Sequence, residues 1–187
     1  MLLYRVFPYL ASASEGQPGH PQYLHRPQGA SRLDNPGEYD CWYLAAEASG
    51  AVGETFADLS IWTPAMFAFP LVPGSARQLG VYQIPDETPI LDLDDAQNLL
   101  DRGLRPTQVI ERNRSVTQTW ALRIFQETTT SGERKWNGVR WWSYQRPQWR
   151  IYGLWEITPE CLQVESLDLD HPAVTDAATA LGRPKGP

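Results

Sequence analysis

Apolar residues between positions 41 and 59 form two different patterns, a continuous run and then a helical spacing. Cys41–Ala45 reads CWYLA, an aromatic and apolar run typical of a short buried strand. Within Ala51–Leu59, apolar side chains recur at Val52 and four and seven positions later, which predicts a helix with one apolar stripe. At ~100° per residue, Glu54 lies about 200° around the helix from Val52. The pattern therefore predicts a strand, a turn and a helix with its one carboxylate off the apolar stripe.

Alternation elsewhere predicts further strands, bounded by Pro and Gly residues. They are expected at Leu2–Phe7 (ended by Pro8), Leu79–Ile84, Pro89–Leu93, Gly138–Tyr144, Trp149–Ile157 and Leu162–Leu169. Helical spacing and caps predict helices over Asp95–Arg102 after a capping Asp94, from Pro106 to Glu111, over Ser115–Glu127 and over Val174–Leu181. The Gly- and Pro-rich residues Ala11–Ser31 are predicted as a long loop, and Arg183–Pro187 as a frayed tail.

Composition restricts the class of protein. The 187 residues are 42% hydrophobic and 20% charged, which predicts one globular domain over residues 1–170, followed by a tail over 171–187. A formal net charge of -6 argues against a non-specific nucleic-acid binder, and no apolar run reaches the ~20 residues that span a membrane. Arg5 and Pro8 interrupt the N-terminal apolar run, so a signal peptide is not expected. With only Cys41 and Cys161, we expect a cytoplasmic protein with free thiols.

Motifs for several common chemistries are absent. The sequence has no G-x-S-x-G, H-E-x-x-H, Walker-type phosphate loop or G-x-G-x-x-G. The histidines His20 and His25 have no acidic or cysteine neighbour at metal-ligand spacing, so no metal site is expected.

The segment WYLAAEASGAVGETFAD, residues 42–58, resembles the central segment of the RES-domain family. Its tyrosine corresponds to Tyr43 and its glutamate to Glu54. An N-terminal Tyr-Arg pair of the family is matched at Arg5. Arg32, in SRLDNPG, is similar to a third family position, although Leu33 replaces an aromatic residue there. Spacing alone favours Glu54 as a solvated helix residue, and Arg32 could instead pair with Asp34 or Glu38 near the turn.

Two serines of this sequence could correspond to the serine of the family. Ser115 with Gln118 forms an S-x-x-Q capping box, which explains Ser115 structurally. The same residues also resemble a helix start at which some RES members place a substrate-contacting serine. Ser143, in WWSYQ, resembles a later family segment in which Tyr144 replaces an arginine. The sequence leaves both serines as candidates.

The resemblance implies a fold and an activity. It implies an ADP-ribosyltransferase-like α+β fold, with two small packed sheets and flanking helices around an NAD cleft. It further implies a toxin that breaks the nicotinamide–ribose bond of NAD⁺, by hydrolysis or with inorganic phosphate as acceptor. Such toxins are neutralised by an Xre-type antitoxin protein, and a homodimer within the toxin–antitoxin complex is compatible with the resemblance.

The residue types suit that chemistry. Cleavage of a glycosidic bond passes through an oxocarbenium-like state, which a carboxylate such as Glu54 stabilises. Arginines hold pyrophosphate through paired, charge-assisted hydrogen bonds, and Arg5 and Arg32 are the candidates. Tyr43 offers an aromatic face and a hydroxyl to the nicotinamide. Either serine, Ser115 or Ser143, could donate to a ribose or phosphate oxygen.

Two alternatives stay open at this point. The enzyme could transfer ADP-ribose to a protein instead of to water or phosphate. The eight Trp and eight Tyr residues could instead form a non-enzymatic face that binds sugars or peptides. Convergence of Arg5, Tyr43 and Glu54 in one cleft would favour the enzyme, whereas an open platform of tryptophans would favour the binding module.

Overall fold

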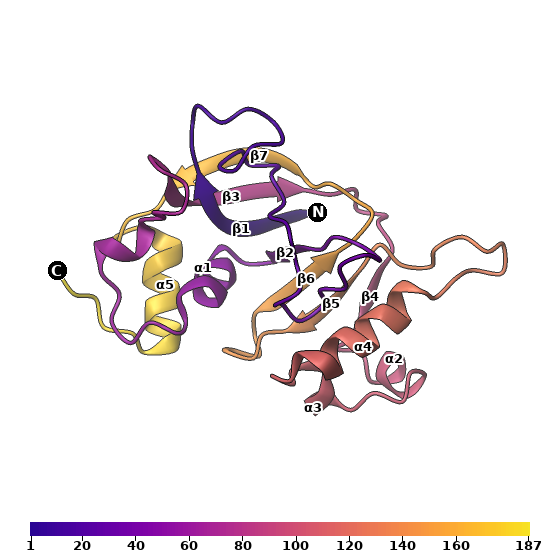
Figure 1. Ribbon diagram of the computed structural model, residues 1–187. Coiled ribbons are helices and arrows are strands. Elements are labelled where there is room, and N and C mark those ends of the chain that lie inside the picture. The colour runs from indigo at the N-terminus through magenta and orange to yellow at the C-terminus, as the bar shows by residue number, and fades with distance from the viewer.

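A mixed seven-stranded sheet runs through the protein (Figure 1). The computed structural model describes all residues from Met1 to Pro187. The strands are β1 (Leu2–Tyr9), β2 (Trp42–Ala45), β3 (Ala76–Gln83), β4 (Ile90–Asp92), β5 (Gly138–Trp142), β6 (Arg150–Leu154) and β7 (Glu160–Ser166). Their order is β4-β5-β6-β2-β1-β3-β7, and only the β4–β5 pair is parallel. The predicted strands are all present.

The sheet is narrow at its middle. β1 pairs with β3 along its whole length, from Leu2 opposite Gln83 to Tyr9 opposite Ala76, but it pairs with β2 only at Tyr4 opposite Ala45. The α+β fold with flanking helices is confirmed. The two small sheets expected from the resemblance are two halves of one continuous sheet, joined at this single residue pair.

β1 continues through Pro8, contrary to the prediction that Pro8 ends the strand. Beyond Tyr4, β1 has a hydrogen-bonded neighbour on one side only, because β2 has already diverged. A proline, which lacks a backbone N–H, is tolerated on such an edge.

The helices form two groups (Figure 1). They are α1 (Ala48–Phe56), α2 (Ala96–Leu100), α3 (Pro106–Val109), α4 (Arg114–Phe125) and α5 (Pro172–Leu181), with a 3₁₀ turn, η1, at Pro64–Phe67. α1 and α5 lie side by side, while α2, α3 and α4 lie together near β4 and β5. None of these helices has the length and apolar character needed to cross a membrane.

Two hydrophobic cores lie on opposite faces of the sheet. The larger core packs the helices against one face and includes Val52, Trp120 and Val174. The smaller core is centred on Trp42 and Tyr82, on the other face. Residues 11–31 contain no helix or strand, as predicted, and the Tyr82 hydroxyl donates to Pro21 O within this loop. Alternation along each strand, with successive side chains on opposite faces, supplies both cores.

Several predicted helix starts shift by one or two residues. α2 is capped by Asp95, whose carboxylate accepts from Asn98 N, and not by Asp94. α4 is capped by Asn113, and the predicted Ser115 capping box does not form. Asn113 lies two residues before Ser115 and takes the cap position, at which Asn is at least as favourable as Ser.

The C-terminal segment differs from the tail that the sequence predicts. α5 buries Ala173, Val174 and two further alanines against α1 and its surroundings. Gly182 ends the helix with φ 62°, a left-handed conformation typical of glycine at this position. Beyond it, Arg183 donates to Ala57 O, and the Trp62 backbone pairs with the residues around Lys185. These residues are therefore anchored to the domain.

Candidate functional site

A cavity of about 360 Å³ opens on the helix-bearing side of the narrow point of the sheet. Its walls come from β1, β2, the loop before β2, α1, the start of α4 and the turn between β5 and β6. The lining residues are Tyr4, Arg5, Val6, Ser31, Arg32, Tyr43, Leu44, Ala45, Ala51, Glu54, Thr55, Arg114, Trp141, Tyr144 and Ile151. Arg5, Arg32, Tyr43 and Glu54, all selected from sequence, thus converge on one cavity.

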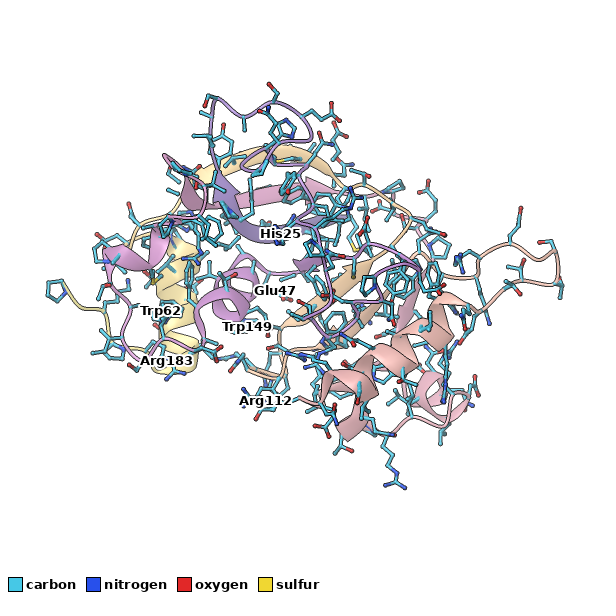
Figure 2. All side chains as sticks on the ribbon, viewed as in Figure 1. His25, Glu47, Trp62, Arg112, Trp149 and Arg183 are labelled. Atoms are coloured by element: carbon cyan, nitrogen blue, oxygen red, sulfur yellow. The ribbon has the colours of Figure 1, made fainter.

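Trp149 determines where α1 lies. Its indole packs against the glycine side of α1, where an added Cβ on Gly53 would lie 2.2 Å from the ring and one on Gly50 3.3 Å away. Figure 2 shows Trp149 beside α1. The two glycines let the helix backbone approach the ring closely. This contact, together with the buried Val52 and Phe56, directs Glu54 into the cavity.

Glu54 is held by a buried serine. The Ser143 hydroxyl donates to Glu54 Oε1 and itself accepts from the backbone N–H groups of Gln145 (2.9 Å) and Arg146 (3.2 Å). Ser143 is 1% exposed, whereas Glu54 is exposed and lines the open cavity. Desolvation by the surrounding protein raises the pKa of Glu54, and the Ser143 hydrogen bond and nearby arginines oppose this shift.

Two arginines act on this carboxyl. Arg32 Nη1 donates to Val109 O (2.6 Å) and Glu111 O (2.8 Å), which fixes its side chain to the segment before α4. The predicted alternative, pairing with a carboxylate near the turn, is wrong. Burial lowers the pKa of Arg32 to about 10, with a smaller contribution from the positive charge of Arg114. Both arginines favour the ionised form of Glu54.

Tyr43 supports the loop that carries Arg32. Its hydroxyl donates to Asp34 Oδ1 (2.7 Å) and accepts from Leu33 N (2.8 Å). The other oxygen of Asp34 accepts from the backbone N–H groups of Gly29 and Ser31. Burial raises the pKa of the Tyr43 hydroxyl, so it stays protonated. Its hydroxyl is committed to positioning residues 31–34, and only its ring faces the cavity.

Arg5 lies at the sheet side of the cavity. Its guanidinium carbon stacks 4.9 Å from the centroid of the Trp42 ring, and burial lowers its pKa. Its Nη1 atom is buried without a hydrogen-bond partner. A buried, unpaired donor of this kind is rare, because it loses its hydration without replacement. Arg5 is not among the charges that shift the pKa of Glu54.

The structure separates the two candidate serines. Ser143 contacts Glu54, whereas Ser115 is exposed, donates to Asn113 Oδ1 and does not line the cavity. Gln118, its expected partner, instead donates to the carbonyl groups of Gly29 and Ser31. This contact ties α4 to the loop bearing Arg32.

Sequence reasoning missed Arg114, Trp141 and Tyr144 as cavity residues. Arg114 is the first residue of α4. The capping pattern predicted that this helix begins at Ser115, one residue later, so Arg114 was assigned to the loop before it. Tyr144 follows Ser143 directly, is 50% exposed and lies under the Arg112 guanidinium at 5.5 Å. No group of three or more His, Cys, Asp or Glu side chains is arranged to hold a metal ion.

Comparison with known proteins identifies the family. The sequence model of the RES domain matches residues 2–176, from the start of β1 into α5. No curated protein matches the chain. Because the match spans nearly the whole sequence, including every cavity residue, this chain belongs to the RES-domain family.

Proposed function

We propose that this protein cleaves the bond between nicotinamide and ribose in NAD⁺. Membership of the RES family is consistent with a role related to NAD. The observation that carries the proposal is Glu54, a hydrogen-bonded carboxyl in a cavity otherwise charged by arginines. Such a preorganised carboxylate suits a site where positive charge develops on a sugar ring.

The reaction breaks the C1′–N bond of the ribose. The bonding electrons move to the pyridinium nitrogen, which leaves as neutral nicotinamide, and the ribose becomes oxocarbenium-like. Ionised Glu54 faces this positive charge, and Ser143 holds the carboxyl in place. Water, or inorganic phosphate, then adds to C1′ and loses a proton. The products are nicotinamide with ADP-ribose, or with its 1-phosphate.

The arginines suit the other end of the substrate. Arg32 is charged and rigidly held, which favours pairing with a phosphoryl group. Arg5 also lines the cavity, with its guanidinium buried against the Trp42 ring. The ring of Tyr43 supplies an apolar wall, while its hydroxyl keeps the Arg32 loop in position.

The alternative function, a sugar- or peptide-binding face of aromatic residues, requires exposed tryptophans. Six of the eight tryptophans are buried, and none is exposed. They pack the core and the sheet instead of forming an open platform. Transfer of ADP-ribose to a protein uses the same bond cleavage and differs only in the acceptor.

Glu54→Gln tests the proposal. The purified protein is incubated with NAD⁺, with and without phosphate, and nicotinamide is measured by chromatography. The variant keeps the side-chain shape but removes the charge, so the rate should fall on the order of a hundredfold to a thousandfold. Binding of NAD⁺ should change less, because the lost interaction belongs mainly to the transition state.

Glu87→Gln is the matched control, since Glu87 is exposed and makes no hydrogen bond. Glu47 is not a suitable control position. It precedes the first residue of α1 (Figure 2), and its carboxylate accepts a hydrogen bond from Arg150 N in β6. Equal rates for wild type and Glu54→Gln, or no release of nicotinamide by the wild type, would exclude this function.

The same proposal includes a cellular role. The family supports a cytoplasmic toxin whose partner is an Xre-type antitoxin. Induced expression should lower cellular NAD⁺ and arrest growth, and co-expression of the antitoxin should restore both.

A further inference from the structure

Positive charge is concentrated in the cavity of a protein that is acidic as a whole. The formal net charge is -6, yet the cavity is lined by Arg5, Arg32 and Arg114 against the single carboxyl of Glu54. A concave site with charges of one sign raises the local potential and attracts ligands of the opposite sign. The cavity therefore favours an anion.

Arg114 is the exposed arginine of the cavity, and its charge favours the ionised form of Glu54. Its guanidinium is exposed in the cavity wall and forms no hydrogen bond or salt bridge. Elsewhere in the molecule, Arg102 and Arg140 each pair with a carboxylate. In the cavity, Arg114 is instead close enough to Arg32 for their charges to repel. An anion between the two arginines would remove this repulsion.

One segment anchors Arg32 and carries Arg114 at the start of α4. Arg32 is tied to the carbonyl groups of Val109 and Glu111, and α4 begins with Arg114 a few residues later. Gln118, one turn along α4, is tied back to the loop that carries Arg32. The loop and the helix start therefore form one hydrogen-bonded unit, which fixes the Arg32 guanidinium and the backbone that carries Arg114 in the lining of the cavity.

We propose that Arg114, together with Arg32, binds the phosphoryl groups of the substrate, so that the enzyme selects phosphorylated nicotinamide ribosides over nicotinamide riboside. This inference rests on the proposed function for the identity of the substrate. Two guanidinium groups provide paired N–H donors that match phosphoryl oxygens. Glu54, on the same cavity, is then left facing the ribose and not the phosphates.

Arg114→Gln tests this role with two substrates. Losing one charge-assisted contact should raise KM for NAD⁺ by roughly 10- to 100-fold, with a smaller change in kcat. Cleavage of nicotinamide riboside, which has no phosphoryl group, should change much less, because Arg114 then acts only through its charge on Glu54. Arg123→Gln is the control, because Arg123 is exposed at the opposite end of α4 and outside the cavity. An unchanged KM for NAD⁺ in Arg114→Gln would overturn the assignment.

Binding of inorganic pyrophosphate provides a measurement that does not depend on turnover. Calorimetry should detect pyrophosphate binding to the wild type and to Arg123→Gln, and weaker binding by at least tenfold to Arg114→Gln. Binding that depends on Arg114 in a protein that does not cleave NAD⁺ would support the anion site and exclude the proposed function. No pyrophosphate binding to the wild type, or equal binding in all three proteins, would overturn the anion site.

Discussion

At the scale of single residues, Glu54 is exposed, as its position off the apolar stripe of α1 predicts, yet it is also held by a buried partner. A helix glutamate off the apolar stripe is normally solvated. Here it accepts from the buried Ser143 hydroxyl, and desolvation raises its pKa above the ordinary value of 4.5. The site keeps an ionisable group where ionisation is unfavourable, a pattern common at functional sites.

This pKa shift predicts how Glu54 affects stability with pH. Well below pH 4.5 the carboxyl is protonated in both the folded and the unfolded chain, and its ionisation contributes nothing to stability. As pH rises from 4.5 to the raised folded pKa, the unfolded chain ionises first, so the free energy of unfolding falls, and it stays lower above that range. Glu54→Gln cannot ionise and should escape this loss.

Urea denaturation of both proteins from pH 4 to pH 8 measures the effect. The stability of Glu54→Gln relative to wild type should increase between pH 4.5 and the folded pKa and then level off. Glu87→Gln, at an exposed position, is measured in parallel. A difference between Glu54→Gln and wild type that is constant, or that shrinks as pH rises, would contradict the assigned shift.

At the scale of elements, the position of α1 depends on two glycines on one of its faces, which have no side chain. Gly50 and Gly53 allow the Trp149 ring to contact the helix backbone, and this contact aligns Glu54 with Ser143 in the turn after β5. Helix propensity alone disfavours glycine in such a position, by roughly 1 kcal/mol relative to alanine. The close packing against Trp149 is what requires it.

Gly53→Ala separates these two effects. Propensity predicts a gain of about 1 kcal/mol, whereas a Cβ placed 2.2 Å and 2.3 Å from two Trp149 ring atoms must displace the helix or the ring. Overpacking of this kind costs typically ~1–3 kcal/mol, so we expect net destabilisation and a lower kcat as Glu54 moves. Chemical denaturation and the NAD⁺ assay measure the two outcomes.

Gly29→Ala is the matched control, because the nearest atom to an added Cβ is 3.8 Å away and Gly29 is exposed. It should leave both stability and kcat close to wild type. A Gly53→Ala protein that is more stable than wild type and fully active would show that Trp149 does not constrain α1.

At the scale of the whole molecule, the cavity lies where the two halves of the sheet meet. Tyr4 opposite Ala45 is the single register pair between β1 and β2, and both residues line the cavity. α1 covers this junction from one side and is itself covered by α5. The C-terminal helix thus supports the site without contributing a residue to it.

Removal of residues 171–187 should therefore impair the site from a distance. Burial of Val174 alone is worth ~1.5–3 kcal/mol, and the buried alanines of α5 add to it. A total loss of roughly 3 kcal/mol or more corresponds to a fall in Tm of about 6–12 °C for a protein of this size. Thermal denaturation monitored by circular dichroism measures it.

A shorter deletion, of Gly186 and Pro187 only, provides the comparison. It removes the hydrogen bond from Gly186 N to Trp62 O and should cost only about 0.5–1.5 kcal/mol. If both deletions lowered Tm equally, α5 would not be part of the stabilising core.

The sequence by itself determined what depends on local pattern. Strand and helix periods located the elements to within a few residues, and the motif around Tyr43 and Glu54 identified the family that the comparison then confirmed. Local chemistry was less decisive where two residues compete for one role, as Asn113 did with Ser115 at the start of α4. Asn and Ser stabilise a helix start by similar amounts, so the sequence does not indicate which of two nearby residues is the cap.

Only the tertiary structure decided which side chains share a site. Ser143 and Glu54 are 89 positions apart, and Arg32 is anchored by carbonyl groups at Val109 and Glu111, about 80 positions away. Such contacts follow from strand order and from the packing of α1 on Trp149, neither of which has a local period. For the same reason the helix predicted over Val174–Leu181 is present as α5, but its packing against the domain was not predicted: its partner surface, α1, is more than a hundred residues earlier in the chain.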